Sequence, residues 1–124
     1  MTTSKPSTVY YTEINDNENI SSVSDKLRNL IIKSGLLDAL GKEEFTCIKL
    51  HFGEKGNTGY IKPEWVKVIA DEARGKTDNI FLTDSNVLYK SNRSNSVDHL
   101  KLAYEHGFDM DRAGAPVIIA DGIF

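Results

Sequence analysis

The chain has 124 residues, of which 40% are hydrophobic and 27% are charged, a balance typical of one soluble globular domain. Its 15 Lys and Arg residues against 18 Asp and Glu residues give a formal net charge of -3, which supplies no basic face for nucleic acid. No apolar run reaches the roughly 20 residues needed to span a bilayer, and the first residues lack the apolar segment of a secretory signal. We therefore expect a cytoplasmic protein that binds neither nucleic acid nor membranes.

The N-terminal part of the chain predicts a strand followed by a helix. Thr8–Ile14 is rich in β-branched and aromatic residues, which favour a strand. From Ile20 to about Ser34 the apolar positions follow helical spacing. Asn19 or Ser21 is suited to cap this helix, and Gly35 is suited to end it.

The central part predicts two further strands around a second helix. Thr46–Phe52 is the second strand, and Asn79–Thr83 is the third. Pro63 stands where the first turn of the intervening helix tolerates proline. The loop Gly53–Gly59 spaces its glycines as G-x-x-G-x-x-G, which is neither the dinucleotide fingerprint nor the P-loop pattern. We interpret it as a structural turn, with phosphate binding as the alternative.

The C-terminal part predicts a polar loop, a third helix and a last strand. The loop is Ser85–Asn95, with Ser94 or Asn95 as the helix cap, and Gly107 ends the helix. The inward face of this helix is predicted to consist of Val97, Leu100, Ala103 and Tyr104. Pro116–Ala120 is a continuous apolar strand of the kind that is buried on both faces of a parallel sheet.

Together these elements predict an α/β fold, an open and mostly parallel sheet in β-α-β-α-β-α-β order with helices on both faces. Residues 1–7 are polar and form a flexible leader, and residues 8–124 form a single domain. A crevice built from strand ends is normally closed by further chain. We therefore expect the domain to be the N-terminal portion of a longer architecture, or a module completed by a partner.

Cys47 is the only cysteine, so an intramolecular disulfide and a cysteine-held iron–sulfur cluster within one chain are excluded. Because Cys47 falls inside an apolar strand, we expect a small buried thiol. A catalytic thiol is the alternative.

Polar clusters follow three of the predicted strands, where an open α/β sheet collects its ligands. They begin at His51, at Asp84 and at Asp121. The candidate ligand-binding residues are His51, Glu54, Asn57, Asp84, Asn86, Arg93, Asp98, His99 and Asp121. His51, Asp84 and Asp121 would converge at one edge, where a histidine with carboxylates suits a divalent metal ion.

Each candidate also has an ordinary structural interpretation. His51 is either a core histidine or a metal ligand or general base, and Asp84 and Asn86 are also turn formers. Arg93 lies either in an ordinary exposed loop or in a mobile lid that presents its guanidinium to an anion. Asp98 complements the dipole of the third helix, and His99, off the predicted apolar stripe, is expected in solvent.

The motifs Lys49–Asn57, Phe81–Asn86, Arg93–Leu100 and Gly114–Gly122 together resemble family 362 of the domains of unknown function. They cover most of positions 46 to 122, and Tyr10–Ile31 is compatible with the start of the family. Proteins of this family are often described as iron–sulfur or ferredoxin-like, and their cluster cysteines stand in a downstream segment. The resemblance thus implies an α/β domain and no iron–sulfur cluster within these residues.

Two functions stay open, and neither specifies a reaction. The first is a ligand- or metal-binding domain, with its site at the carboxyl ends of the strands, within an iron–sulfur redox protein. The second is a non-catalytic docking module for a cluster-bearing domain or another partner. It predicts an exposed apolar surface near Val117–Phe124 and self-association of the chain.

Overall fold

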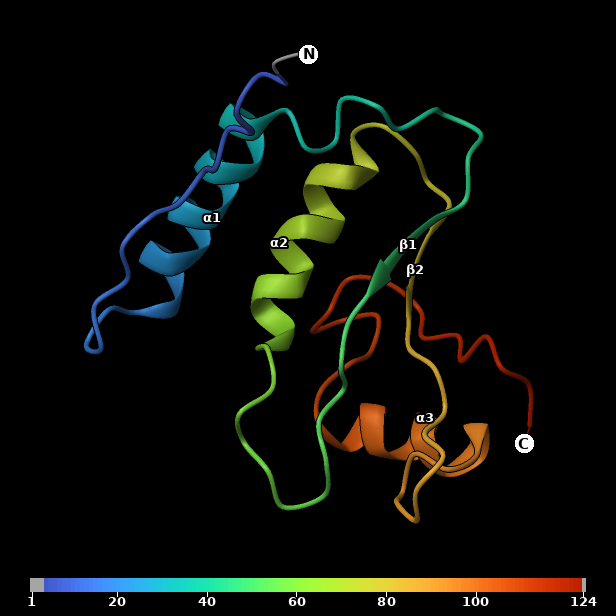
Figure 1. The fold of residues 1–124 in the computed structure, drawn as a ribbon. Helices are drawn as coiled ribbons and strands as arrows, with labels where there is room; N and C mark the ends of the chain where they lie inside the picture. The colour runs from blue at the N-terminus through green and yellow to red at the C-terminus, as the bar shows by residue number, and fades with distance from the viewer. Residues whose placement is uncertain (1–3, 124) are drawn as a thin grey trace.

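The computed structural model describes residues 4–123, so Phe124 and residues 1–3 of the predicted leader lie outside it. The described chain is a mixed α/β fold (Figure 1). Its elements are, in order, α1 (Ile20–Ser34), β1 (Thr46–Lys49), α2 (Pro63–Arg74), β2 (Ile80–Thr83) and α3 (Ser96–Glu105). None of the described helices is both long and apolar enough to cross a bilayer.

The sheet is small and parallel. β1 pairs with β2 so that Thr46 lies beside Ile80 and Lys49 lies beside Thr83. The predicted strand Pro116–Ala120 contributes a single parallel bridge, between Leu82 and Val117. Here the Leu82 N–H donates to the Pro116 carbonyl at 2.8 Å, and the Ile118 N–H donates to the Leu82 carbonyl at 2.9 Å. The C-terminal segment therefore follows the edge of β2 for a short distance only.

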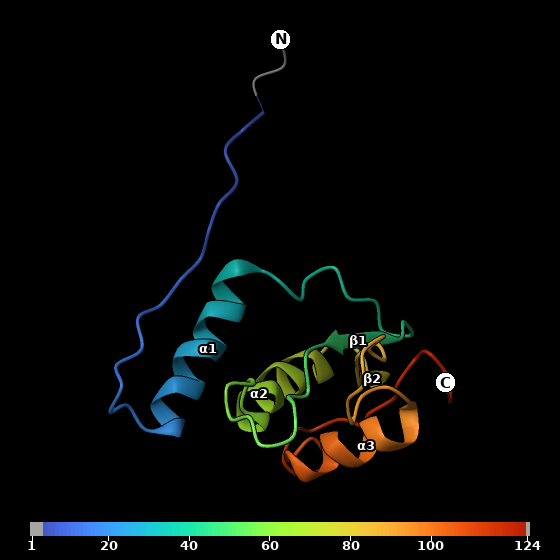
Figure 2. The same ribbon diagram turned by 60° about the horizontal axis from the view of Figure 1, so that its bottom comes forward.

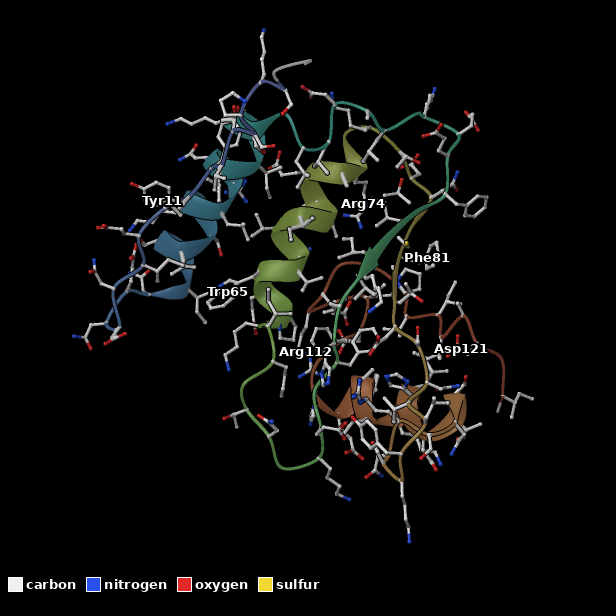
Figure 3. The ribbon with its side chains drawn as sticks, in the orientation of Figure 1. Tyr11, Trp65, Arg74, Phe81, Arg112 and Asp121 are labelled. Carbon is white, nitrogen blue, oxygen red and sulfur yellow. The ribbon has the colours of Figure 1, made fainter. Side chains whose placement is uncertain are left out.

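The predicted first strand is wrong. Thr8–Ile14 forms no strand, and Val9 and Tyr11 are each 81% exposed. The segment runs beside α1 (Figures 1 and 3), where Lys26 Nζ donates to the Glu13 carbonyl at 2.9 Å. Strand-favouring side chains need a neighbouring strand to pack against, and this segment has none among the described residues. The predicted β-α-β-α-β-α-β order is therefore not found in residues 4–123.

Local signals placed the helix ends correctly. The Asn19 side chain accepts a hydrogen bond from the Ser22 N–H at 2.9 Å. Gly35 ends α1 with a φ of 64°, in the left-handed region that favours glycine. The Asn95 side chain likewise accepts from the Asp98 N–H at 3.0 Å at the start of α3. Pro63 is the first residue of α2, as predicted.

The core lies on one face of the sheet, under α2 and α3. Ile80 and Leu82 alternate inward from β2, and they meet Val66 and Ala70 from α2 and Ala103 from α3. Figure 2 shows both helices on the same side of the two strands. α1 packs against α2 instead of the sheet, and Trp65 lies on the side of α2 that faces it (Figure 3).

The other face of the sheet is left uncovered by the described helices, contrary to the prediction. Phe45 is 81% exposed and Ile118 is 51% exposed. Cys47 on β1 is exposed as well, so the expected buried thiol is wrong. Cys47 is the partner of Phe81 in the register, which places both side chains on this face.

The predicted inward face of α3 is also wrong, except at Ala103. Val97, Leu100 and Tyr104 are exposed, whereas Ser96, His99 and Leu102 are buried. The inward stripe of this helix thus carries two polar residues. A search for apolar periodicity cannot detect such a stripe, because it assigns polar residues to the solvent.

Candidate functional site

The candidate site lies where β1 and β2 end, because parallel strands bring their carboxyl ends to one edge of the sheet. The chain leaves β1 through His51, Phe52 and Gly53, and it leaves β2 at Asp84. The Gly53 backbone has a φ of 95°, and an added Cβ atom would lie 2.5 Å from the Tyr60 ring. Only glycine fits at this turn, and it lets the aromatic ring approach the backbone.

Arg93 is the centre of this edge, and it is only 4% exposed. Its Nη1 atom donates to Asp84 Oδ2 at 3.0 Å, and its Nε atom donates to Glu54 Oε1 at 2.9 Å. Its Nη2 atom donates to the Tyr89 hydroxyl at 2.8 Å. A buried charge is costly unless it is paired and hydrogen-bonded, and Arg93 has both kinds of partner. The Arg93 side chain is therefore buried and paired in this arrangement, although its loop also carries the exposed residues Leu88 and Tyr89.

Glu54 joins the loop after β1 to the Arg93 loop. The Tyr89 hydroxyl donates to Oε1 at 2.8 Å, and the Ser91 hydroxyl donates to Oε2 at 2.9 Å. Hydrogen bonds from Tyr89, Ser91 and Arg93 hold the pKa of Glu54 at about 2 against the effect of desolvation. The carboxylate is therefore ionised at neutral pH, and its oxygens point to this loop.

Asp84 is shared between the two basic residues of the edge. It is 7% exposed, and its Oδ1 atom accepts from Lys49 Nζ at 3.2 Å and from the Ser85 N–H at 2.9 Å. Its Oδ2 atom accepts from Arg93. The carboxylate thus ties the end of β1 to the end of β2.

His99 lies behind Asp84 and is fully buried. The Ser96 hydroxyl uses its one proton to donate to the Gly122 carbonyl. The same hydroxyl oxygen therefore accepts from Asn86 Nδ2, at 3.1 Å. This arrangement turns the Asn86 oxygen toward His99 Nδ1, 3.2 Å away, and makes that nitrogen the donor. His99 Nε2 has no hydrogen-bond partner among residues 4–123, and it lies 3.6 Å from Asp84 Oδ2. Burial lowers the pKa of His99, so we assign a neutral ring.

Asp121 connects the C-terminal segment to the same network. Its Oδ2 atom accepts a hydrogen bond from the Asn86 N–H at 2.5 Å, and Figure 3 shows Asp121 on the segment that passes near α3. Six of the nine predicted residues are therefore joined by hydrogen bonds or ion pairs, namely Glu54, Asp84, Asn86, Arg93, His99 and Asp121.

The other predicted residues lie outside this network. Asp98 bonds with Asn95 and Lys101 at the start of α3, and these bonds lower its pKa. His51 and Asn57 line a neighbouring cleft of about 480 Å³. The lining of the cleft is Leu50, His51, Gly53, Asn57, Gly59, Tyr60 and Ile61.

The walls of this cleft are held by backbone hydrogen bonds and by stacking. His51 Nδ1 accepts from the Gly53 N–H at 2.9 Å. The Tyr60 ring stacks on His106 with a centroid separation of 4.4 Å and an interplanar angle of 4°. His106 Nδ1 is bonded in turn to the Phe52 carbonyl at 2.7 Å. The aromatic wall is thus anchored to the strand end.

Sequence reasoning missed several members of the site. Tyr89 and Ser91 lie in the same polar loop as the candidate residue Arg93, so their hydroxyl groups could have been predicted as part of the site. Lys49 and Ser96 carried no such indication, since one lies within a strand and the other at a helix start. Their roles depend on contacts with Asp84 and Asn86 that only the folded chain makes.

The predicted metal ligands have separate roles in this arrangement. Asp84 bonds with Arg93, Asp121 with the Asn86 backbone, and His51 with the Gly53 backbone. Within residues 4–123, no group of three or more His, Cys, Asp and Glu residues is placed to hold a metal ion. A divalent metal on His51, Asp84 and Asp121 stays a prediction.

The family model for the domain of unknown function DUF362 matches residues 46–123. The chain belongs to this family. The match confirms the resemblance and includes every polar strand end, from His51 to Asp121, but it does not extend over Tyr10–Ile31. No curated protein and no solved structure matches the chain. Membership in DUF362 assigns no reaction, so function has to be argued from the site.

Proposed function

We propose that this DUF362 chain binds a small organic molecule at the carboxyl ends of its strands, in the cleft beside the Arg93 network. The cleft of about 480 Å³ carries the proposal. Its volume lies within the roughly 300–1,000 Å³ of small-molecule sites, which combine apolar walls with a few placed polar groups. An iron–sulfur setting remains an implication of the family resemblance alone.

The Arg93 network supports the proposal because it fixes the loops around the cleft. A buried ion pair adds little to stability compared with apolar side chains of the same size. Positioning is therefore the better explanation of the paired charges. Glu54 lies in the loop between His51 and Asn57, and its carboxylate accepts a hydrogen bond from Arg93. A loop held in this way presents its polar groups without the entropy cost of ordering on binding.

The proposal is tested by adding a library of small organic fragments to the chain labelled with nitrogen-15 and recording amide chemical shifts. We expect the amide signals of Gly53, Asn57 and Gly59 to move together with a single dissociation constant. Replacing Arg93 with Met should weaken this binding at least several-fold. Arg28→Met is the control, because Arg28 pairs with Asp25 and Glu72 and has no link to the Arg93 network in the described structure. A folded chain in which no fragment moves these signals would contradict the proposal.

The second candidate function is docking through the uncovered sheet face. An apolar groove of about 410 Å³ lies on this face. It is lined mainly by Phe45, Phe81, Pro116, Ile118 and Ala120. Parallel sheets are normally covered on both faces, so such a surface is suited to a partner. Ile123, 63% exposed, adds apolar surface near the C-terminal segment.

Sedimentation separates this candidate from the first. If the face docks, the isolated chain should self-associate, and Ile118→Asp should make it monomeric. Leu88→Asp is the matched control, because Leu88 is fully exposed in the Arg93 loop and lies outside the groove. A monomeric unmodified chain would count against docking and leave the proposal for the cleft unaffected.

A further inference from the structure

We infer that the ligand of the cleft is a small carboxylate with a flat apolar body, held by His51 and Asn57. This inference rests on the proposed function and specifies its ligand class. It depends on which atoms of the two side chains are already used by the backbone.

His51 lines the cleft, and one nitrogen of its ring is a donor. Its Nδ1 atom accepts from the Gly53 backbone N–H at 2.9 Å. A backbone N–H can only donate, so Nδ1 carries no proton and the neutral ring carries its proton on Nε2. A metal ion would bind a nitrogen that lacks a proton, as metal-bound histidines do while donating with the other nitrogen. His51 has the opposite arrangement, which suits an oxygen acceptor.

Asn57 presents a donor for the same reason. Its Oδ1 atom accepts from the Gly59 backbone N–H at 2.6 Å. The amide nitrogen, with two N–H groups, is therefore the end of the side chain that is left for a ligand. The Asn57 N–H donates to the Glu54 carbonyl at 2.9 Å, which fixes the turn that carries the side chain.

The remainder of the cleft favours a flat body and a negative charge. Leu50, Tyr60 and Ile61 form apolar walls, and the stack on His106 fixes the orientation of Tyr60. No acidic side chain lines the cleft in the described chain. Lys62 Nζ lies 5.8 Å from the centroid of the Tyr60 ring and adds positive charge beside it. Two neutral donors and a nearby ammonium group match the two oxygens of a carboxylate.

Three compounds with the same ring test the inference in amide-shift titrations: benzoate, benzamide and benzylamine. We expect benzoate to bind most tightly, with benzylamine at least about tenfold weaker, since its ammonium group cannot accept from the two donors and lies near Lys62. Asn57→Asp should weaken benzoate and strengthen benzylamine. The new carboxylate can still accept from Gly59, so the turn is retained.

His51→Phe retains a flat ring but removes both the donor and the acceptor of the Gly53 N–H, so it should weaken benzoate binding at least about tenfold. Lys55→Met is the control, because Lys55 is exposed on the same loop and does not line the cleft. Equal binding of benzoate and benzamide, or tighter binding of benzylamine, would overturn the ligand class and leave the cleft as a binding site. No movement of the Gly53, Asn57 and Gly59 signals with any compound would overturn the inference and weaken the proposed function with it.

Discussion

The carboxyl edge of the sheet buries charged and polar residues, whereas its uncovered face exposes apolar ones. At the edge, Arg93, Asp84 and His99 are between 0% and 7% exposed. On the face, Phe45 and Ile118 are 81% and 51% exposed. Both departures from the usual distribution need an explanation. The buried charges find their partners within the chain, whereas the exposed apolar groups find none in residues 4–123. The charged groups of the edge are therefore paired and held in position, and the face is a surface that a partner could cover.

The largest expected effect comes from removing one charge at the edge. Asp84→Ala leaves Arg93 buried with one carboxylate in place of two, so we expect a loss of about 3–5 kcal/mol in the free energy of unfolding. Urea denaturation measures this loss. Asp25→Ala is the control, since Asp25 forms an exposed pair with Arg28 and such a pair contributes at most about 1 kcal/mol. Similar losses for the two variants would remove the contrast between the edge and the surface.

A smaller effect tests the glycine that joins the strand end to the cleft. In Gly53→Ala the new methyl group meets Tyr60 and His106, so we expect a loss of about 1–3 kcal/mol. Benzoate binding should weaken as well, because the Tyr60 wall has to move. Gly56→Ala is the control. Gly56 also has a positive φ, 81°, but a Cβ atom added there would meet nothing within 4 Å. If both variants bind benzoate equally, the aromatic wall does not define the cleft.

The pH dependence of stability tests the neutral His99. Burial lowers its pKa below the usual 6.5, opposed by the nearby Asp84. As the pH falls, the unfolded chain therefore protonates this histidine before the folded chain does. The free energy of unfolding consequently decreases as the pH falls from about 7 toward 5. His99→Gln should reduce the change of the urea midpoint with pH over this range. Glu54, with a pKa of about 2, contributes stability that is present above its ordinary value of 4.5 and lost in stronger acid. If the urea midpoint of His99→Gln changes with pH as much as that of the unmodified chain, groups other than His99 cause the effect.

The smallest effect is expected on the uncovered face. Phe45→Ser should change the free energy of unfolding of the monomer by no more than about 0.5 kcal/mol, because the ring is already in solvent. Phe52→Ala, in the buried core, should cost about 3–5 kcal/mol by comparison. A loss above 2 kcal/mol for Phe45→Ser would mean that the face is covered in solution.

The sequence predicted those features that depend on near neighbours. The caps at Asn19 and Asn95 rely on bonds to residues three positions away, so local patterns suffice for them. The position of Asp84 after a strand followed from the apolar run before it. These same local patterns placed most of the polar network in one region of the sheet, and family membership agrees with that placement.

The features that failed depend on distant partners. Arg93 is buried because Glu54, separated by 39 positions, accepts from it. His99 is buried because α3 turns a polar stripe toward Phe52 and Asp84. Within the described part of the chain, the strand-like Thr8–Ile14 has no neighbouring strand, and Cys47 lies on a sheet face that no helix covers. Strand pairing and burial are properties of the assembled chain, so no local pattern specifies them.

One titration tests the contrast between edge and face most directly. Benzoate is added to the labelled chain, and the amide shifts of Gly53, Asn57 and Gly59 are compared with those of Phe81 and Ile118. A cleft held by the Arg93 network predicts saturable movement of the first three signals and constant positions for the other two. Movement confined to Phe81 and Ile118 would show that the ligand prefers the uncovered face, and it would contradict a binding site at the carboxyl edge.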